Sequence, residues 1–119
     1  MADATEILWE VEVACPDPDT ARAIARAAVE ARLAACATVL PGAESHYRWH
    51  AEVVQDVEAL LRLKSTPALV AALCALIRTR HSYELPAIVA WPAAALGPGV
   101  AGWLTDELSP GPGAGAATP

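Results

Sequence analysis

The chain of 119 residues carries 14 acidic and 8 basic side chains, for a net charge of −6, and 55% of its residues are hydrophobic. This length suits one domain. The scattered Lys and Arg argue against a nucleic-acid partner, because binding to a phosphate backbone needs clustered cations. No apolar run reaches 18 residues and the N-terminus lacks a signal-peptide pattern, so we predict no membrane span and no secretory signal.

The cysteines indicate the cellular compartment of the protein, and the mean hydropathy indicates whether it self-associates. Cys15, Cys36 and Cys74 are widely spaced and form no CxxC motif, which fits a reducing compartment and predicts a cytoplasmic protein. A mean hydropathy of +0.32 is high for so short a chain. Since a small domain has little interior and monomers rarely expose large apolar patches, this value favours self-association.

The first predicted strand covers residues 7–15, where Ile7, Trp9, Val11 and Val13 alternate with Leu8, Glu10 and Glu12. A helix follows and is expected to end near Leu33. Asp17 is its predicted N-cap and Pro18 its first residue, since Pro lacks the N–H that this position leaves unpaired.

A long hairpin is predicted over residues 34–64. The Pro41–Gly42 pair in its first arm marks a bend or bulge. Its tip lies near residues 50–52, without the Gly or Asn that favours a tight turn. A second helix is expected with Thr66 as its cap and Pro67 as its first residue. A fourth strand at 87–92 and a short helix at 99–108 complete the pattern.

The order strand, helix, strand, strand, helix, strand, short helix predicts an α+β protein. Two βαβ halves joined by a hairpin give the ferredoxin-like split βαβ sandwich, an antiparallel sheet with helices on one face. We expect one domain over residues 1–108 and a disordered Pro/Gly/Ala tail over residues 109–119. This architecture hosts many unrelated activities, so it does not define the function.

Four stretches then identify a family. They are "CPDPDTARAIARAAVEARLAACATVLPG", "SHYRWHAEV", "HSYELP" and "AGWL". In this order and spacing, from about Ile7 to Leu108, they resemble the CutA family of divalent-cation tolerance proteins. The resemblance implies a ferredoxin-like fold, a compact homotrimer whose long hairpins pair across subunits, and a role in tolerance of copper and other divalent metals.

The resemblance also implies a metal-ligand set, from which this chain departs. Some family members bind metal through a first-strand Cys and two adjacent His before the Tyr-Glu segment. Here Val13 holds the Cys position, with Cys15 two residues later, and Arg80 replaces one of the two His, leaving His81. The charge of Arg80 opposes a cation. The resemblance still implies copper or another divalent metal as the ligand, here on a reduced set of residues, and no essential cofactor.

The candidate metal ligands are His81, Glu84 and Cys15, and Tyr83, Tyr47 and Trp49 are candidate cleft or interface residues. Imidazole and carboxylate together suit Cu(II) or Zn(II). The structural alternative is that His81 ends a helix, Tyr83 packs with its hydroxyl bonded, and Glu84 pairs with an Arg. Tyr47 and Trp49 lie on one face of the hairpin, where aromatic residues commonly serve packing or interfaces.

The sequence also bears on two other classes of function, an enzyme and a signalling module. No GxSxG or phosphate-binding loop is present, and the chain contains no Asn, which acylphosphatases of the same fold require, so we predict no enzyme. The remaining alternative is a trimeric signalling module of the PII type that binds a nucleotide or small anion. It predicts that Arg48, Lys64, Arg78 and Arg80 converge on one cleft.

Overall fold

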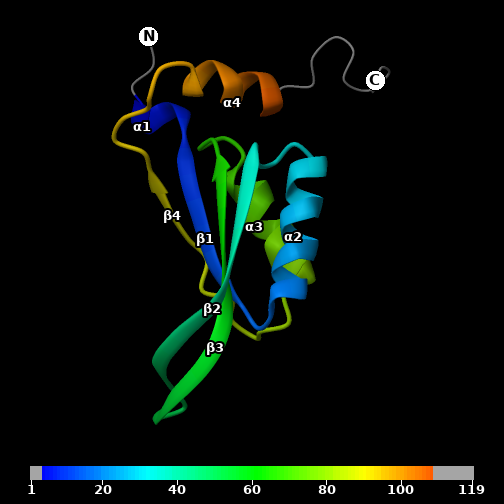
Figure 1. Ribbon diagram of the computed structural model, residues 1–119, viewed down its shortest axis with the longest axis vertical. Coiled ribbons are helices and arrows are strands. Elements are labelled where there is room, and N and C mark those ends of the chain that lie inside the picture. The colour runs from blue at the N-terminus through cyan, green and yellow to red at the C-terminus, as the bar shows by residue number, and fades with distance from the viewer. Residues whose placement is uncertain (1–3, 109–119) are drawn as a thin grey trace.

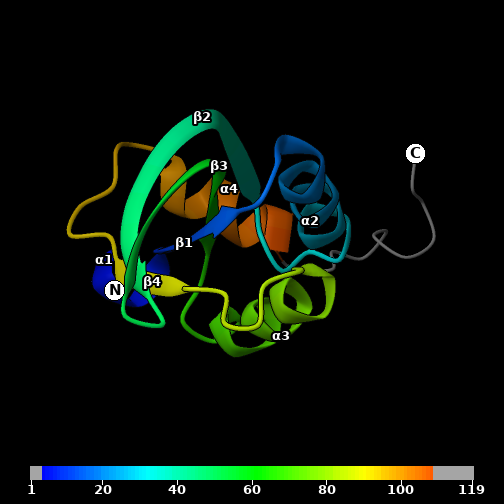
Figure 2. The ribbon, with the colours of Figure 1, turned by 90° about the horizontal axis from the view of Figure 1, so that it is seen from below.

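A computed structural model describes residues 4–108 of the protein. Its four strands form one antiparallel sheet in the order β2-β3-β1-β4, and α2 and α3 cover one face (Figures 1 and 2). This confirms the ferredoxin-like α+β prediction; the tail at 109–119 lies outside the described residues. The elements are α1 (Ala4–Ile7), β1 (Trp9–Cys15), α2 (Pro18–Glu30), β2 (Cys36–Trp49), β3 (Glu52–Ser65), α3 (Val70–Arg80), β4 (Val89–Pro92) and α4 (Val100–Leu108).

The first strand follows its predicted alternation, but it starts later. Val11, Val13 and Cys15 are buried against the helices, while Glu10 and Glu12 lie on the other face. Those two carboxylates pair with Lys64 and Arg62 across β1 and β3. The segment before the strand is instead the short helix α1, which sequence periodicity did not predict.

Helix α2 begins as predicted. The side chain of Asp17 accepts a hydrogen bond of 2.7 Å from the Thr20 N–H, and Pro18 is the first helical residue. This bond lowers the pKa of Asp17. The helix ends at Glu30, short of the predicted Leu33, because the chain turns through Arg32 at a positive φ of 58°.

The predicted start of the second helix was wrong. Helix α3 begins at Val70 after Leu69, and no side chain caps it. The Leu69 N–H bonds instead to the Thr66 carbonyl, so residues 66–69 form a tight turn and Thr66 is not the N-cap. The fourth strand is likewise shorter than predicted, because the segment at 82–88 runs as a loop before Val89.

The hairpin of β2 and β3 extends well beyond the helices (Figure 1). The predicted bulge is confirmed: the register shifts between Leu40 and Ala43, and Gly42 has a φ of 79°. At the tip, His50 and Ala51 both have positive φ values, 48° and 66°. These values describe a left-handed two-residue turn, the type that Asn-Gly normally supplies.

Replacing Ala51 with glycine is expected to raise the free energy of unfolding by about 0.5–1 kcal/mol, because glycine adopts positive φ without a Cβ penalty. Chemical denaturation at fixed protein concentration measures the change. Ala71→Gly is the matched control, since Ala71 is exposed within α3 and glycine there should cost about 0.5–1 kcal/mol. Equal losses from both substitutions would contradict the strained turn.

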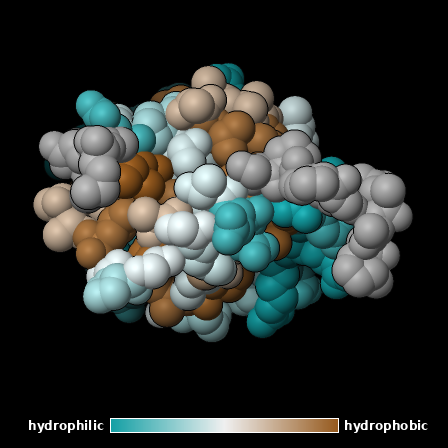
Figure 3. All heavy atoms as spheres, turned by 90° about the horizontal axis from the view of Figure 1, so that it is seen from above, coloured by the Kyte–Doolittle hydropathy of each residue, from teal (hydrophilic) through white to brown (hydrophobic). Residues whose placement is uncertain are grey.

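Two apolar clusters hold the domain together. The larger lies between the sheet and the helices α2 and α3. The smaller joins Leu8, Leu104 and Leu108 and fixes α4 across the end of the sheet that is remote from the hairpin. Seen from that end, hydrophobic patches are interspersed with polar ones (Figure 3). The clusters leave the projecting hairpin without a covering helix.

Candidate functional site

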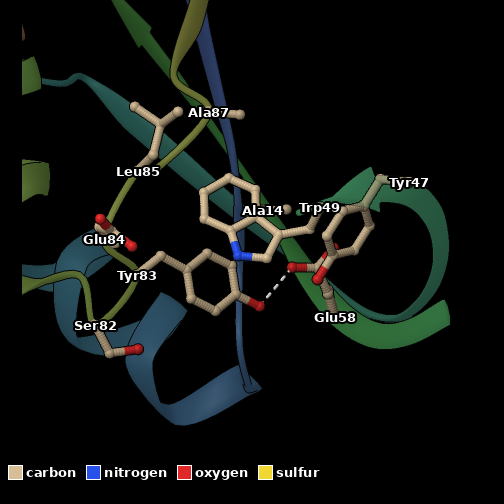
Figure 4. Close-up of a pocket in the computed structure, with 9 residues that line it drawn as sticks. All are labelled: Ala14, Tyr47, Trp49, Glu58, Ser82, Tyr83, Glu84, Leu85 and Ala87. Atoms are coloured by element: carbon tan, nitrogen blue, oxygen red, sulfur yellow. Dashed lines mark hydrogen bonds between the residues drawn. The ribbon is translucent and has the colours of Figure 1, made fainter. Parts of the chain in front are cut away.

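A pocket of about 450 Å³ lies on the sheet face away from α2 and α3, where β1 ends and the hairpin begins to project. Strand β2 contributes two aromatic residues to it, β3 one carboxylate, and the loop before β4 most of the remaining wall (Figure 4). Its lining residues are Ala14, Tyr47, Trp49, Glu58, Ser82, Tyr83, Glu84, Leu85 and Ala87.

His81 ends α3 and ties the pocket loop to the sheet. Its Nε2 lies 2.7 Å from the Ala14 carbonyl oxygen, and its Nδ1 accepts a 3.1 Å hydrogen bond from the Tyr83 N–H. Since a carbonyl can only accept, Nε2 carries the ring proton and donates it to Ala14. The side chain is buried, with 8% of its surface exposed. Both ring nitrogens are therefore already engaged within the chain.

Two tyrosines donate hydrogen bonds to neighbouring carboxylates on β3. The Tyr83 hydroxyl lies 2.6 Å from Oε2 of Glu58, and the Tyr47 hydroxyl bonds to Asp56. Burial, and then the hydrogen bond to Glu58, raise the pKa of Tyr83 well above its ordinary value. The hydrogen bond to Asp56 is the main cause that raises the pKa of Tyr47. Both phenols are therefore neutral donors that hold the carboxylates in place.

The structure brings most of the predicted site residues together. Tyr47, Trp49, Tyr83 and Glu84 line one pocket, and His81 lies directly behind it, with its ring centroid 4.7 Å from that of Tyr83. Within residues 4–108, Glu84 forms none of the ion pairs that the structural alternative predicted for it.

Cys15 points the other way. Its neighbour Ala14 lines the pocket, but successive residues of a strand face opposite sides, and Cys15 is fully buried in the main core. Burial, followed by the charges of Asp17 and Glu58, raises the pKa of Cys15 to about 11. Because the thiolate is the form that ligates metals, this environment disfavours soft-metal capture.

The residues of a single chain do not form a closed metal-ligand set. Throughout the described range 4–108, no three side chains of His, Cys, Asp or Glu lie close enough together to hold an ion. Val13, at the family's Cys position, is part of the core, and Arg80 is exposed at the end of α3. Any ion bound at the pocket would need ligands beyond those of one chain.

Glu58 is a pocket residue that was not predicted from the sequence. This residue is buried, with 6% of its surface exposed, and it supplies the carboxylate that Tyr83 holds. The available signal was a single acidic residue inside the apolar run from Val57 to Leu61. A charge at such a position is costly unless it is paired, so it marks a site or a hydrogen-bonded network.

The cations of the signalling alternative do not converge within one chain. Arg48 lies opposite Val53 near the hairpin tip, whereas Lys64 pairs with Glu10 at 3.0 Å near the other end of β3. From Val53 to Lys64 the strand spans roughly 36 Å at about 3.3 Å per residue. The pocket itself is lined by carboxylates and has no Lys or Arg in its wall.

The fold defines the class of this molecule, a small α+β protein of the ferredoxin-like type with an acidic, aromatic pocket. The family model described as "CutA1 divalent ion tolerance protein" matches residues 10–107. The chain therefore belongs to the CutA1 divalent ion tolerance family. That family is named for tolerance of divalent ions and not for a catalytic activity.

Individual relatives agree with this assignment. The chain is 42% identical over 97 residues to the divalent-cation tolerance protein CutA of Thermus thermophilus, covering 82% of this chain and 94% of the relative. Protein CutA of mouse is 37% identical over 100 residues, covering 82% of this chain and 56% of the relative, so the chain spans about half of that longer protein. No helix within residues 4–108 is long and apolar enough to cross a membrane.

Solved structures confirm the fold. The divalent cation tolerance protein from Thermus thermophilus superimposes with a TM-score of 0.82 at 39% identity, over 86% of this chain and 99% of that one. CutA from Xylella fastidiosa gives a TM-score of 0.83 at 33% identity, over 87% and 99% of the two chains.

Proposed function

We propose that the protein is a cytoplasmic, non-enzymatic homotrimer that contributes to divalent-metal tolerance by weakly binding a cation at clefts between its subunits. The observation that carries this proposal is the pocket, whose wall holds the carboxylates of Glu58 and Glu84 and no Lys or Arg. Its chemistry favours a cation over a nucleotide or small anion. Cu(II) is the first ion to test, because copper tolerance is what the family resemblance implies.

Exposed apolar side chains support self-association. Val53 and Val57 on the hairpin are 69% and 68% exposed, and Leu85 in the pocket wall and Val89 on β4 are 67% and 57% exposed. Monomers seldom leave such a set in water. A second subunit packed here would cover the hairpin and complete the ligand set that one chain lacks.

The cytoplasmic location rests on the composition of the chain. A structure of the same fold, from Archaeoglobus fulgidus at 22% identity, is described as a periplasmic protein. At that identity the likeness concerns the fold alone and does not bear on the location of this protein. Fractionation of cells that express it tests the cytoplasmic location.

Light scattering with size-exclusion chromatography is expected to give three times the mass of one chain; a monomer at micromolar concentration would overturn the trimer.

Calorimetric titrations with Cu(II), Zn(II) and ATP then test the ligand. We expect Cu(II) binding that Glu84→Gln weakens about tenfold, since one carboxylate ligand is lost. Glu107→Gln, an exposed change on α4, is the matched control. Binding of ATP alone would favour the signalling alternative.

A further inference from the structure

Three aromatic side chains and two carboxylates line the pocket. Tyr47 and Trp49 come from β2 and Tyr83 from the loop before β4, and Figure 4 shows Glu58 between the two tyrosines and Glu84 on the opposite side of Tyr83. Aromatic faces carry negative potential and attract cations, most strongly cations that have lost their water. The wall therefore combines two independent features that favour positive charge.

Glu58 has one oxygen still available. Its Oε2 accepts the Tyr83 hydroxyl, and its Oε1 accepts no hydrogen bond from any residue in the described part of the chain. The residue is more than nine-tenths buried and lines the pocket. A charged N–H donor forms a stronger hydrogen bond to a carboxylate oxygen than a neutral donor does. A ligand that bears such a group could donate to this oxygen.

In a single chain, without ligands from a second subunit, the shape and the ligand count of the pocket favour an organic cation over a bare metal ion. A divalent ion needs several oxygen, nitrogen or sulfur ligands at short distances, and one chain gathers no such group within residues 4–108. A cavity of about 450 Å³ with aromatic walls is of the size that takes a small organic molecule. Alkyl groups would pack against the rings while the charge meets Glu58.

We infer that the pocket binds a small primary alkylammonium ion, with its NH₃⁺ group on Glu58 and its alkyl chain against Trp49 and Tyr83. This inference rests on the proposal that the pocket is the cation site of the protein. It goes beyond that proposal because it gives the site a ligand other than a metal ion. The ammonium needs no ligand from a second chain.

n-Butylammonium and n-butanol test the inference, because the two probes share an alkyl chain and differ in charge. Calorimetry at neutral pH, on the purified protein free of metal, is expected to show at least tenfold tighter binding of n-butylammonium. Quenching or shift of tryptophan fluorescence should accompany binding and should be reduced in Trp49→Leu. Equal affinity for both probes, or binding of neither, would overturn the inference.

Three variants locate the ammonium. Glu58→Gln should weaken n-butylammonium binding about tenfold and leave n-butanol binding unchanged. Glu84→Gln, across Tyr83 from Glu58, should weaken n-butylammonium binding by a smaller factor, and Glu107→Gln should change the binding of neither probe. The Glu84 variant guards against a fold effect, because Glu84 is exposed whereas Glu58 also holds Tyr83. Unchanged affinity in both pocket variants overturns the inference. Metal binding without amine binding would refute this inference alone, and amine binding without metal binding would refute only the metal part of the proposed function.

Discussion

Replacing Leu61 with alanine is expected to lower the free energy of unfolding by about 2–5 kcal/mol. Leu61 is fully buried at the centre of β3, where it pairs with Val13 on one side and Val39 on the other. The loss combines the transfer free energy of the deleted methyl groups with the cavity that the surrounding side chains cannot close. The sheet holds both the core and the pocket, so this residue supports both.

Urea denaturation followed by circular dichroism measures this change. Protein concentration must be the same for each variant, because an oligomer's apparent stability depends on it. Val29→Ala is the control: Val29 lies on α2, away from the hairpin, and is 41% exposed, so its truncation should cost less than about 1 kcal/mol. An equal loss in both variants would contradict the cavity cost assigned to Leu61.

Much of the fold could be predicted because its signals are local. The alternation of Val11 and Val13 with Glu10 and Glu12 fixes which face of β1 is buried, and Asp17 followed by Pro18 fixes the start of α2. Pro41–Gly42 marks the bulge. Each of these three features depends only on residues that are neighbours in the sequence, so the sequence alone is enough to predict it.

The predictions from sequence failed where contacts between residues far apart in the chain determine the structure. Thr66 is a residue type that commonly caps helices, but here the chain makes a tight turn before α3 begins. Cys15, a candidate metal ligand in the sequence, continues the buried alternation of Val11 and Val13. The pocket joins β2, β3 and a loop that are far apart in the sequence, and no local pattern pairs Glu58 with Tyr83, 25 residues away.

His81 shows how one residue can satisfy two interpretations. Its predicted structural role is present, since its backbone ends α3 and its ring bonds to Ala14 and Tyr83. Its role as a metal ligand stays a proposal. A metal ion could reach either ring nitrogen only by replacing one of these hydrogen bonds, so metal binding at His81 would loosen the loop that forms the pocket wall. The two roles compete for the same atoms.

His81→Ala is therefore expected to lower the free energy of unfolding by about 2–4 kcal/mol, because two buried hydrogen bonds are lost and the Ala14 carbonyl is left without its donor. The same urea experiment measures it. The pocket should lose its shape as well, so this variant should bind both n-butylammonium and Cu(II) more weakly. Ligand binding is measured without urea, where the folded form still dominates.

His46→Ala is the matched control for this substitution. His46 is exposed on the hairpin, and within residues 4–108 its side chain pairs only with Glu44, at 2.8 Å. Its loss should therefore change the free energy of unfolding by less than about 0.5 kcal/mol. If His81→Ala is as stable as His46→Ala and yet loses Cu(II) binding tenfold, His81 is a ligand and not an anchor. If stability and both ligands are lost together, the ring acts by holding the loop against β1.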